Sequence, residues 1–382
     1  MTLSASRSAT RSGGDGAPTS ALAVSIATDA DDPELRRLLR DTPMPGAVSV
    51  AFAREPSFFH GAGVEGETTT VTARSPDGRM VALFSRSARQ WWVDGSPRRV
   101  GYLSALRVDP VYRHRRALLR IGFDAARALH EADPDALPYA LTTIVSDNAP
   151  ARRLLEAGLP GLPTYHRRDE LVTFAAPTWR RRYRPVDGLT VRPAADWDEV
   201  TPVLARWGAR HAYAVAWDAD TLRDPVRCRG LAVGDVAVAE RAGRIVGCVA
   251  RWDQSGFKQT VVHGYQGPLR WARPLANAVA PALGIPRLPA PGAPLKHAYL
   301  SHLAVDDDDP EVARALVTWA HDRSLGAGYS YLTTMLAVRH PLYAVLRRAL
   351  RPLEYRSMLY LAAWATLPPT PTAIPHLEVA VL

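Results

Sequence analysis

A chain of 382 residues is long enough for two or three domains, each with its own hydrophobic core. Its 47% hydrophobic and 22% charged residues are those of an ordinary globular protein, and no apolar run approaches the ~20 residues of a membrane-spanning helix. The formal net charge of +9 comes almost entirely from arginine, since Lys258 and Lys296 are the only lysines among 47 Lys and Arg. Such a bias is typical of a GC-rich genome, and no nucleic-acid-binding motif accompanies it. We therefore expect neither nucleic acid nor a membrane as a partner.

The first 22 residues are rich in Ser, Thr, Gly and Ala, which predicts a disordered tail and not a secretory signal. Two cysteines, Cys228 and Cys248, are too few for a disulfide framework and lie in apolar surroundings. Both are predicted to be buried thiols. These features together predict a cytoplasmic protein.

Residues 23–178 are predicted to form an α/β unit with a strand-helix-strand crossover at its centre. Its expected elements, in chain order, are helix 35–40, the hairpin strands 68–73 and 81–85, strand 99–108 after a tight turn at 94–95, a helix from residue 118, strand 139–145, helix 148–157 and strand 171–174.

After a linker at 179–188, residues 189–366 repeat this plan. The expected elements are helix 197–207, strands 236–240 and 245–252, strand 298–305, helix 311–325, strand 329–335 and helix 340–349. Residues 256–294 are rich in Pro and Gly and are predicted to be an irregular insertion. Residues 367–382 are predicted to be a Pro-rich tether followed by a terminal strand, 376–382.

Two stretches of the chain repeat each other closely. Tyr102-Leu-Ser-Ala-Leu-Arg-Val-Asp109 recurs as Tyr299-Leu-Ser-His-Leu-Ala-Val-Asp306, and Leu141-Thr-Thr-Ile144 recurs as Leu332-Thr-Thr-Met335. We call residues 102–144 the first copy and residues 299–335 the second copy. A repeat of this length indicates two similar domains.

The copies differ in the loop between their repeated segments. The first copy contains Arg113-His-Arg-Arg116 at the expected start of a helix, where backbone N–H groups and the helix dipole favour an anion. The second copy contains Asp306-Asp-Asp-Asp309, followed by Pro310 and Glu311, a sequence typical of a helix cap. The spaced ligands of a calcium loop are missing there, so no metal is expected. We predict a phosphate site in the first copy and none in the second.

These motifs resemble the GCN5-related N-acetyltransferase (GNAT) superfamily, present as a tandem pair. Leu106-Arg-Val-Asp-Pro110 with Tyr112-Arg113 resembles the strand and loop that open the family's acyl-CoA site, and Asn148 with Ala151 resembles its "N-x-x-A" helix. The resemblance implies an α/β fold with two GNAT-like domains, each a mixed, mostly antiparallel twisted sheet flanked by helices with a central β-α-β crossover.

The resemblance also implies an N-acyltransferase that uses acetyl-CoA or another acyl-CoA as co-substrate. A primary amine of a small molecule or peptide would attack the thioester directly, and a backbone N–H near Val108 would stabilise the oxyanion. The expected cofactor-binding residues are Leu106, Arg107, Val108, Arg113, His114, Arg115, Arg116, Ala117, Leu118 and Asn148.

The general acid and base are not defined by the motif, because Leu155 occupies the position of the family's usual tyrosine. Candidate acids are Tyr112 and Tyr165, and candidate bases are Glu55 and His60. Ser104 is a candidate to relay a proton near the acceptor. Each of these residues has an ordinary alternative in packing or hydrogen bonding, and Asn148 has one as a helix N-cap.

Two other functions remain open. The first is transfer of a longer acyl group, from CoA or from an acyl-carrier protein, to a peptide or natural-product amine. The second is a GNAT-like protein that binds acyl-CoA or a partner without turnover. The sequence fits a monomer or a homodimer and does not identify the acceptor.

Overall fold

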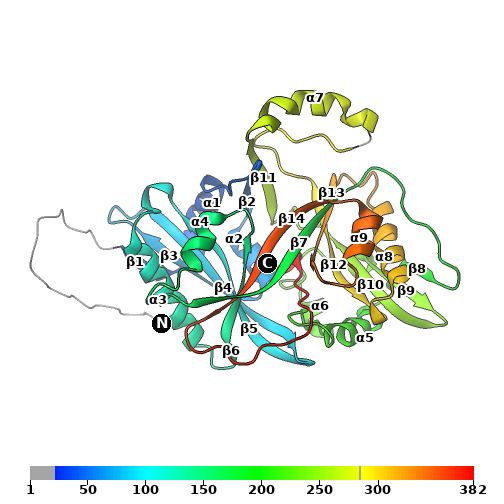
Figure 1. Ribbon diagram of the computed structural model, residues 1–382, viewed down its shortest axis with the longest axis horizontal. Helices are drawn as coiled ribbons and strands as arrows, with labels where there is room; N and C mark the ends of the chain where they lie inside the picture. The colour runs from blue at the N-terminus through cyan, green and yellow to red at the C-terminus, as the bar shows by residue number, and fades with distance from the viewer. Residues whose placement is uncertain (1–21, 284) are drawn as a thin grey trace, which may run out of the picture.

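A computed structural model describes residues 22–283 and 285–382 of the chain, so the predicted tail lies almost wholly outside the described residues. The described residues form one continuous 12-stranded sheet in the order β1-β3-β4-β5-β6-β14-β7-β13-β12-β10-β9-β8, and a separate two-stranded sheet pairs β11 with β2 (Figure 1). Helices α1 to α4 lie beside the N-terminal part of the long sheet, and α5, α8 and α9 lie beside its C-terminal part. Among these residues no helix is long and apolar enough to cross a bilayer.

The elements of the N-terminal half are β1 (Ala23–Ile26), α1 (Asp32–Asp41), β2 (Val48–Ala53), α2 (Phe58–Glu65), β3 (Glu67–Arg74), β4 (Met80–Val93), β5 (Ser96–Val108), α3 (Arg116–Glu131), β6 (Ala136–Val145), α4 (Ala149–Leu155) and β7 (Thr164–Pro177). Every helix and strand predicted for this half is present. Strands β1 and β2 and helix α2 were not predicted; α2 begins after Ser57, whose side chain accepts a hydrogen bond from the Phe59 N–H.

The elements of the C-terminal half are β8 (Thr190–Pro193), α5 (Trp197–Gly208), α6 (Ala219–Arg223), β9 (Val236–Arg241), β10 (Arg244–Trp252), β11 (Gln259–Tyr265), α7 (Pro268–Leu283), β12 (His297–Val305), α8 (Pro310–Asp322), β13 (Tyr331–Ala337), α9 (Tyr343–Leu350) and β14 (Leu353–Ala363). The predicted helices and strands of this half are all present except the terminal strand.

Several features of this half were predicted wrongly or missed, including the short elements β8 and α6. The insertion 256–294 is not irregular throughout, because it contains β11 and α7. Strand β14, which follows α9, was missed. The predicted terminal strand is wrong: residues 379–381 form a 3-10 helix in which Ala380 and Val381 are buried.

The centre of the sheet is built by strands exchanged between the two halves. Strand β7 pairs with β13 and β14 pairs with β6, and β7 and β14 also pair with each other. Figure 1 shows the two strands crossing the middle of the molecule side by side. The division into domains 23–178 and 189–366 therefore stays a prediction, and these strands bind the two ranges into one sheet.

The long sheet is antiparallel except at the two crossovers. Strand β5 is parallel to β6 across α3, and β12 is parallel to β13 across α8. The expected mixed, mostly antiparallel sheet with β-α-β crossovers is thus confirmed. The largest cluster of buried apolar side chains is shared by the two halves, and it also includes Leu377, Ala380 and Val381 from the C-terminal segment.

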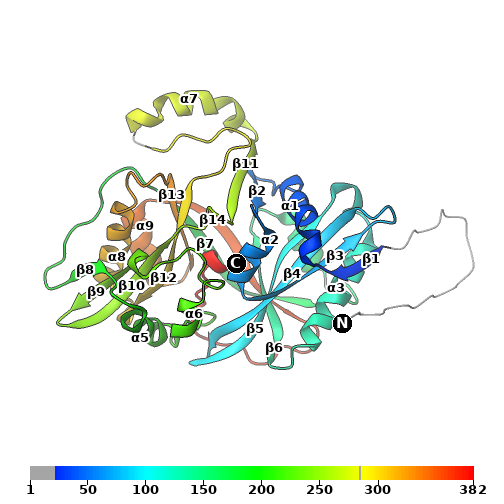
Figure 2. The ribbon, with the colours of Figure 1, turned by 180° about the vertical axis from the view of Figure 1, so that it is seen from behind.

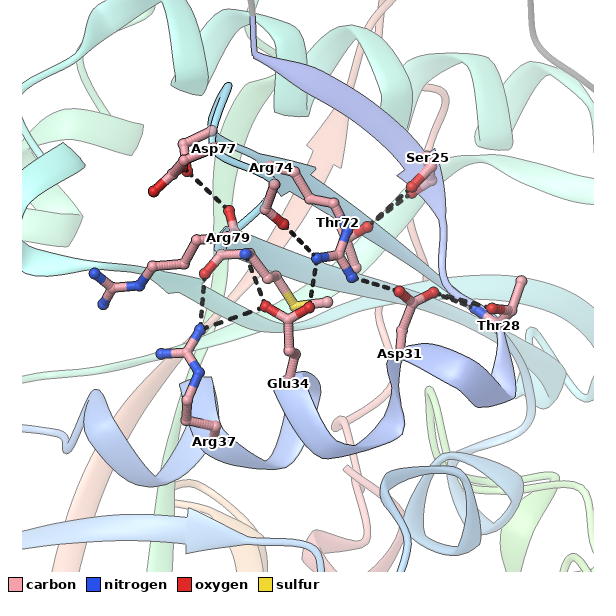
Figure 3. Close-up of polar contacts among 12 residues, drawn as sticks. Ser25, Thr28, Asp31, Glu34, Arg37, Thr72, Arg74, Asp77 and Arg79 are labelled. Carbon is pink, nitrogen blue, oxygen red and sulfur yellow. Dashed lines mark hydrogen bonds and ion pairs between the residues drawn. The ribbon is translucent and has the colours of Figure 1, made fainter.

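Helix α1 is fixed to the β3–β4 hairpin by both apolar and polar contacts. It buries Leu35, Leu38 and Leu39. On its other side Arg74 donates to Asp31 over 2.6 Å, and the Met80 N–H donates to Glu34 over 2.9 Å (Figure 3). These contacts fix α1 to the hairpin whose second strand, β4, pairs with β5 of the first copy.

Candidate functional site

Strands β5 and β6 are in register over only part of their length. The pairing runs from Arg99 to Tyr102. Beyond it β6 is no longer paired with β5, whereas its opposite edge stays paired with β14 as far as Val145. The Tyr102 hydroxyl lies 2.7 Å from Thr143 Oγ1, and Thr142 donates to the Leu103 carbonyl over 2.9 Å, so side chains hold the point of divergence. Beyond it β5 is partly exposed, and Leu106 is 47% exposed.

A β-bulge interrupts β5 just past this point. Ala105 has φ of +54°, which non-glycine residues adopt only when the surroundings enforce it. The register with β4 shifts between the pairs Ser85–Ser104 and Leu83–Arg107. Residues 105 and 106 of β5 therefore lie opposite a single residue of β4, Phe84. Such bulges redirect backbone groups and are common beside active sites.

The second copy contains the same bulge at the same place. His302 occupies the position of Ala105 and has φ of +52°. The register with β10 shifts between Cys248–Ala304 and Ala250–Ser301, and β12 is in register with β13 only from His297 to Tyr299. The geometry of the repeat is therefore preserved although its side chains differ.

In the second copy the chain itself fills the space beside the bulge. Residues 376–382 lie against β12 and β13, and all nine residues of β12 are buried. The His302 N–H donates to the Glu378 carboxylate over 2.8 Å. The space that remains is about 10 Å³, too small for a ligand. This copy is occupied by its own C-terminal segment.

Two buried ionisable groups hold the C-terminal segment 376–382 in place: Glu378 within it and Lys258 beside it. Burial raises the pKa of Glu378 to about 7, against the attraction of Arg89. Burial also lowers the pKa of Lys258 to about 7, and its ammonium donates to the backbone oxygens of Ala380 at 3.2 Å and Leu382 at 3.0 Å. Nothing in the sequence pattern pointed to these residues, because their hydrogen-bond partners lie 76 to 124 positions away.

The loop before α3 has the features expected of an anion site. Helix α3 has no side-chain cap and no acidic residue in its first turn. Arg113, His114 and Arg115 are exposed on the loop, and the Arg115 guanidinium lies 4.7 Å from the centre of the Tyr112 ring. Ala117 is exposed and Leu118 is buried. Cations at a helix N-terminus oppose the dipole, so an anion would be stabilised there.

The loop before α8 is different. Asp309 caps this helix, accepting from the Glu311 and Val312 N–H groups at 2.8 and 3.2 Å, which confirms the predicted cap. The neighbouring carboxylates are paired with arginines: Asp306 with Arg206 and Arg244, Asp307 and Asp308 with Arg210, and Asp309 with Arg241. Because these carboxylates are neutralised by arginines, the main difference between the two helix starts is that α8 has a side-chain cap and α3 has none.

The candidate acids and bases lie in several different places. Tyr165 is half-buried, with its ring edge-on to Phe123, and desolvation raises its pKa. Tyr112 packs beside Leu118 near the basic loop. Glu55 forms ion pairs with arginines of α1, and His60 lies on α2. The structure does not join these four into one cluster through hydrogen bonds within the described residues.

Ser104 has a partner that the sequence did not suggest. Its hydroxyl donates to the Glu65 carboxylate over 3.3 Å, and Arg54 donates to the same carboxylate over 3.1 Å. Glu65 is buried at the end of α2. A buried carboxylate therefore lies next to the residue that precedes the bulge. Asn148, in contrast, is the N-cap of α4 and accepts from the Ala151 N–H over 3.3 Å.

One group of side chains has ligand atoms close enough for a metal ion. His211, Asp308 and His340 each offer an atom within 4.8 Å of the others. The His340 Nδ1 accepts from the Leu342 N–H at 3.1 Å, so a neutral ring carries its proton on Nε2. Nε2 could bind a metal ion only without this proton, so the His340 ring would first have to rotate away from the Leu342 N–H. The contacts of this group favour a structural role.

No family model matches the sequence, and no curated protein matches it. Solved structures do match. A GCN5-related N-acetyltransferase from Sphaerobacter thermophilus has a TM-score of 0.55 and 13% identity, over 94% of this chain and 98% of the other. The Saccharomyces cerevisiae N-myristoyltransferase with bound myristoyl-CoA has a TM-score of 0.59 and 13% identity, over 94% and 86%.

A third structure is a GCN5-related glucosamine N-acetyltransferase region within a fungal multi-domain GH3 β-N-acetylglucosaminidase. It has a TM-score of 0.58 and 14% identity over 91% of this chain, and this chain spans 39% of that longer one. The chain has the GNAT fold. Each match covers at least nine-tenths of the sequence, so both copies of the repeat belong to this fold and the predicted resemblance is confirmed at the level of the fold.

Proposed function

We propose that the protein is a GNAT-type N-acyltransferase that binds acyl-CoA at the first copy. The observation that carries the proposal is the divergence of β5 from β6 beside a bulge and an uncapped, basic helix start. The pantetheine arm would lie along β5 beyond Tyr102, and the pyrophosphate would lie at the α3 N-terminus, where Arg113 and Arg115 can donate to it.

The reaction needs no nucleophile from the protein. The neutral amine of the acceptor attacks the thioester carbonyl, a C–N bond forms, and the C–S bond breaks. CoA leaves as a thiolate and takes up one proton, while the acceptor nitrogen loses one. Positioning of the two substrates supplies most of the acceleration in such a transfer.

The bulge supplies the oxyanion donor in this proposal. The sequence suggested a backbone N–H near Val108, and the bulge at Ala105 and Leu106 is the better candidate. The support comes from the second copy, in which the equivalent His302 N–H already holds a carboxylate oxygen at 2.8 Å. A backbone amide fixed in a bulge can donate to a developing oxyanion without reorganising.

Glu65 is the proposed base, acting through Ser104. The carboxylate lies 3.3 Å from the Ser104 hydroxyl, which can pass a proton from the incoming ammonium. Arg54 fixes the orientation of the carboxylate through the second oxygen. Tyr112 remains the proposed acid for the leaving thiolate, because it lies at the loop end of β5.

The acyl group is proposed to be acetyl, with longer chains as the alternative. One solved relative binds myristoyl-CoA, which makes a long chain compatible with the fold. The acceptor is proposed to be a primary amine of a small molecule or peptide, in the cytoplasm.

The test is calorimetric titration with CoA, acetyl-CoA and myristoyl-CoA, followed by thiol release with a panel of amines. Binding at micromolar levels with amine-dependent thiol release is expected. Binding without release on any amine would favour the non-catalytic alternative, and failure of every CoA ligand to bind would overturn the proposal.

A further inference from the structure

Helix α7 stands apart from the rest of the molecule. Figures 1 and 2 show it beyond the end of β11, joined to the body by that strand and by a returning segment, 285–294. Strand β11 pairs with β2 from Gln259–Ala53 to Tyr265–Val48, which anchors the base of this projection to the N-terminal half. The helix itself is presented to solvent.

The exposed face of α7 is apolar. Four large side chains follow one another at every fourth position and are strongly exposed: Trp271 (78%), Leu275 (70%), Val279 (42%) and Leu283 (56%). This spacing places them along one side of a helix. Ile285 continues the same apolar surface at 43% exposure.

Two polar residues of α7, Arg273 and Asn277, are instead bonded to the returning segment. Arg273 donates to the Pro289 carbonyl over 3.1 Å. Asn277 donates to the Leu288 carbonyl over 3.0 Å and accepts from the Leu288 N–H over 2.7 Å. A helix on the surface of a globular protein normally turns its polar face to water and its apolar stripe to the core. Helix α7 does the opposite, so its outer face is built to contact something other than water.

The charge around this face has one sign. The sequence contains no Asp or Glu between Asp253 and Asp306. Arg270 and Arg287 are exposed and come before and after the apolar stripe in the sequence, and the Arg270 guanidinium lies 5.3 Å from the centre of the Trp271 ring. A tryptophan and leucines flanked by arginines form the composition of helices that lie in the interface of a bilayer.

We propose that α7 is an interfacial helix that binds the surface of an anionic phospholipid membrane. The stripe from Trp271 to Leu283 enters the boundary between headgroups and acyl chains, and Arg270 and Arg287 pair with lipid phosphates. Charge decides against a second copy of the chain as the occupant, because two segments with arginines and no carboxylates would repel each other. The proposal does not depend on acyl transfer.

This proposal reverses the expectation that no membrane is a partner. That expectation rested on the lack of a long apolar run, which excludes a spanning helix only. A helix that lies in the interface needs one apolar face and no continuous apolar sequence. Only the fold shows that this face is turned away from the protein.

The test is flotation of the full chain with vesicles of phosphatidylcholine alone and of phosphatidylcholine mixed with phosphatidylglycerol. The apparent affinity should be at least ~10-fold higher for the anionic vesicles, and it should fall by a similar factor when Trp271→Glu and Leu275→Glu are combined. Leu353→Glu is the matched control, since Leu353 is a large apolar side chain, 64% exposed, on β14. Arg270→Ala should reduce the preference for the anionic vesicles.

Circular dichroism and thermal unfolding check that the variants are folded. Equal affinity for both kinds of vesicle, or binding that the α7 variant retains, would overturn the proposal. A dimer in sedimentation velocity that Trp271→Glu dissociates, without vesicle binding, would also overturn it and assign the face to a second copy. Loss of CoA binding in the α7 variant alone would point to a structural effect and count against it as well.

Discussion

The first and second copies of the repeat share a backbone and differ in what lies beside their bulges. Both crossovers diverge after a tyrosine, at Tyr102 and Tyr299, and both bulges have a positive φ. In the second copy residues 376–382 fill the divergence, and a carboxylate accepts the bulge N–H. In the first copy β5 is partly exposed from Leu103 onward.

The helices that follow the two bulges also differ at their N-termini, in the same sense as the bulges: one is satisfied by a carboxylate of the chain and the other is not. Helix α8 has an aspartate cap and helix α3 has none. A cap and a bound anion satisfy the same backbone N–H groups, so they are alternatives. In the second copy carboxylates of the chain satisfy both backbone positions, and under the proposed function acyl-CoA would satisfy the same two positions in the first copy. The predictions below test that equivalence.

The largest effect is expected at the proposed base. Glu65→Gln should lower kcat/KM by about 100-fold at neutral pH, because the amide cannot take up the proton of the acceptor. The affinity for acyl-CoA, measured by calorimetry, should be unchanged. Glu131→Gln, at an exposed carboxylate of α3, is the control. A larger loss in Glu55→Gln than in Glu65→Gln would transfer the role to Glu55.

The next effect concerns the carboxylate that fills the second copy. Burial raises the pKa of Glu378 from 4.5 to about 7, so the unfolded chain releases this proton first and the folded state loses stability as the pH rises from 4.5 through 7. The loss amounts to about 3 kcal/mol. Glu378→Gln keeps an acceptor for the His302 N–H and removes the charge.

Urea unfolding of this variant should therefore show a gain relative to the wild type that is small near pH 4.5 and reaches about 3 kcal/mol above pH 7. Lys258 is present in both proteins, so its titration cancels in the difference. A pH-independent difference between the two proteins would show that the pKa of Glu378 is the same in the folded and unfolded states, and so that burial does not raise it.

A third variant gives the first copy the cap of the second. Arg115 is the N-cap residue of α3 and has an extended backbone, as a capping aspartate needs. Arg115→Asp should weaken CoA binding by about 10- to 100-fold, through loss of a charged donor and competition for the backbone N–H groups. The same change should stabilise the fold by about 1 kcal/mol.

If a cap and a bound phosphate use the same backbone N–H groups, Arg115→Asp should weaken CoA binding and raise the stability of the fold at the same time. Arg115→Ala separates the lost cation from the added cap, and Arg348→Ala, at an exposed arginine of α9, should change neither quantity. If Arg115→Asp left CoA affinity intact, the helix start could not be where the phosphates bind.

The smallest effect is expected at Asn148. Its side chain caps α4, whereas the corresponding α9 begins without a side-chain cap. Asn148→Ala should cost about 1 kcal/mol of stability, measured by thermal unfolding, and should leave CoA affinity within about twofold. A large loss of affinity at unchanged stability would instead give the side chain a direct contact with the cofactor.

Local patterns predicted most of the elements correctly. The alternation and the Asp94–Gly95 turn gave the β4–β5 hairpin, and the apolar spacing after Leu118 gave α3. Asp309 and Asn148 were identified as caps from their position before a helix. These features depend on residues within a few positions of each other, which is why they can be predicted from a single sequence.

The sequence by itself determined the repeat, the basic and acidic loops within it, and the α/β plan. All three depend on patterns of residues that are close together in the chain. Only the tertiary structure decided that β7 and β14 are exchanged, that Glu65 lies against Ser104, and that Glu378 fills the second bulge. It also decided that the apolar face of α7 is turned outward. Each of these depends on contacts between segments far apart in the chain, and no local pattern records which distant partner a buried charge or an unpaired strand edge will meet.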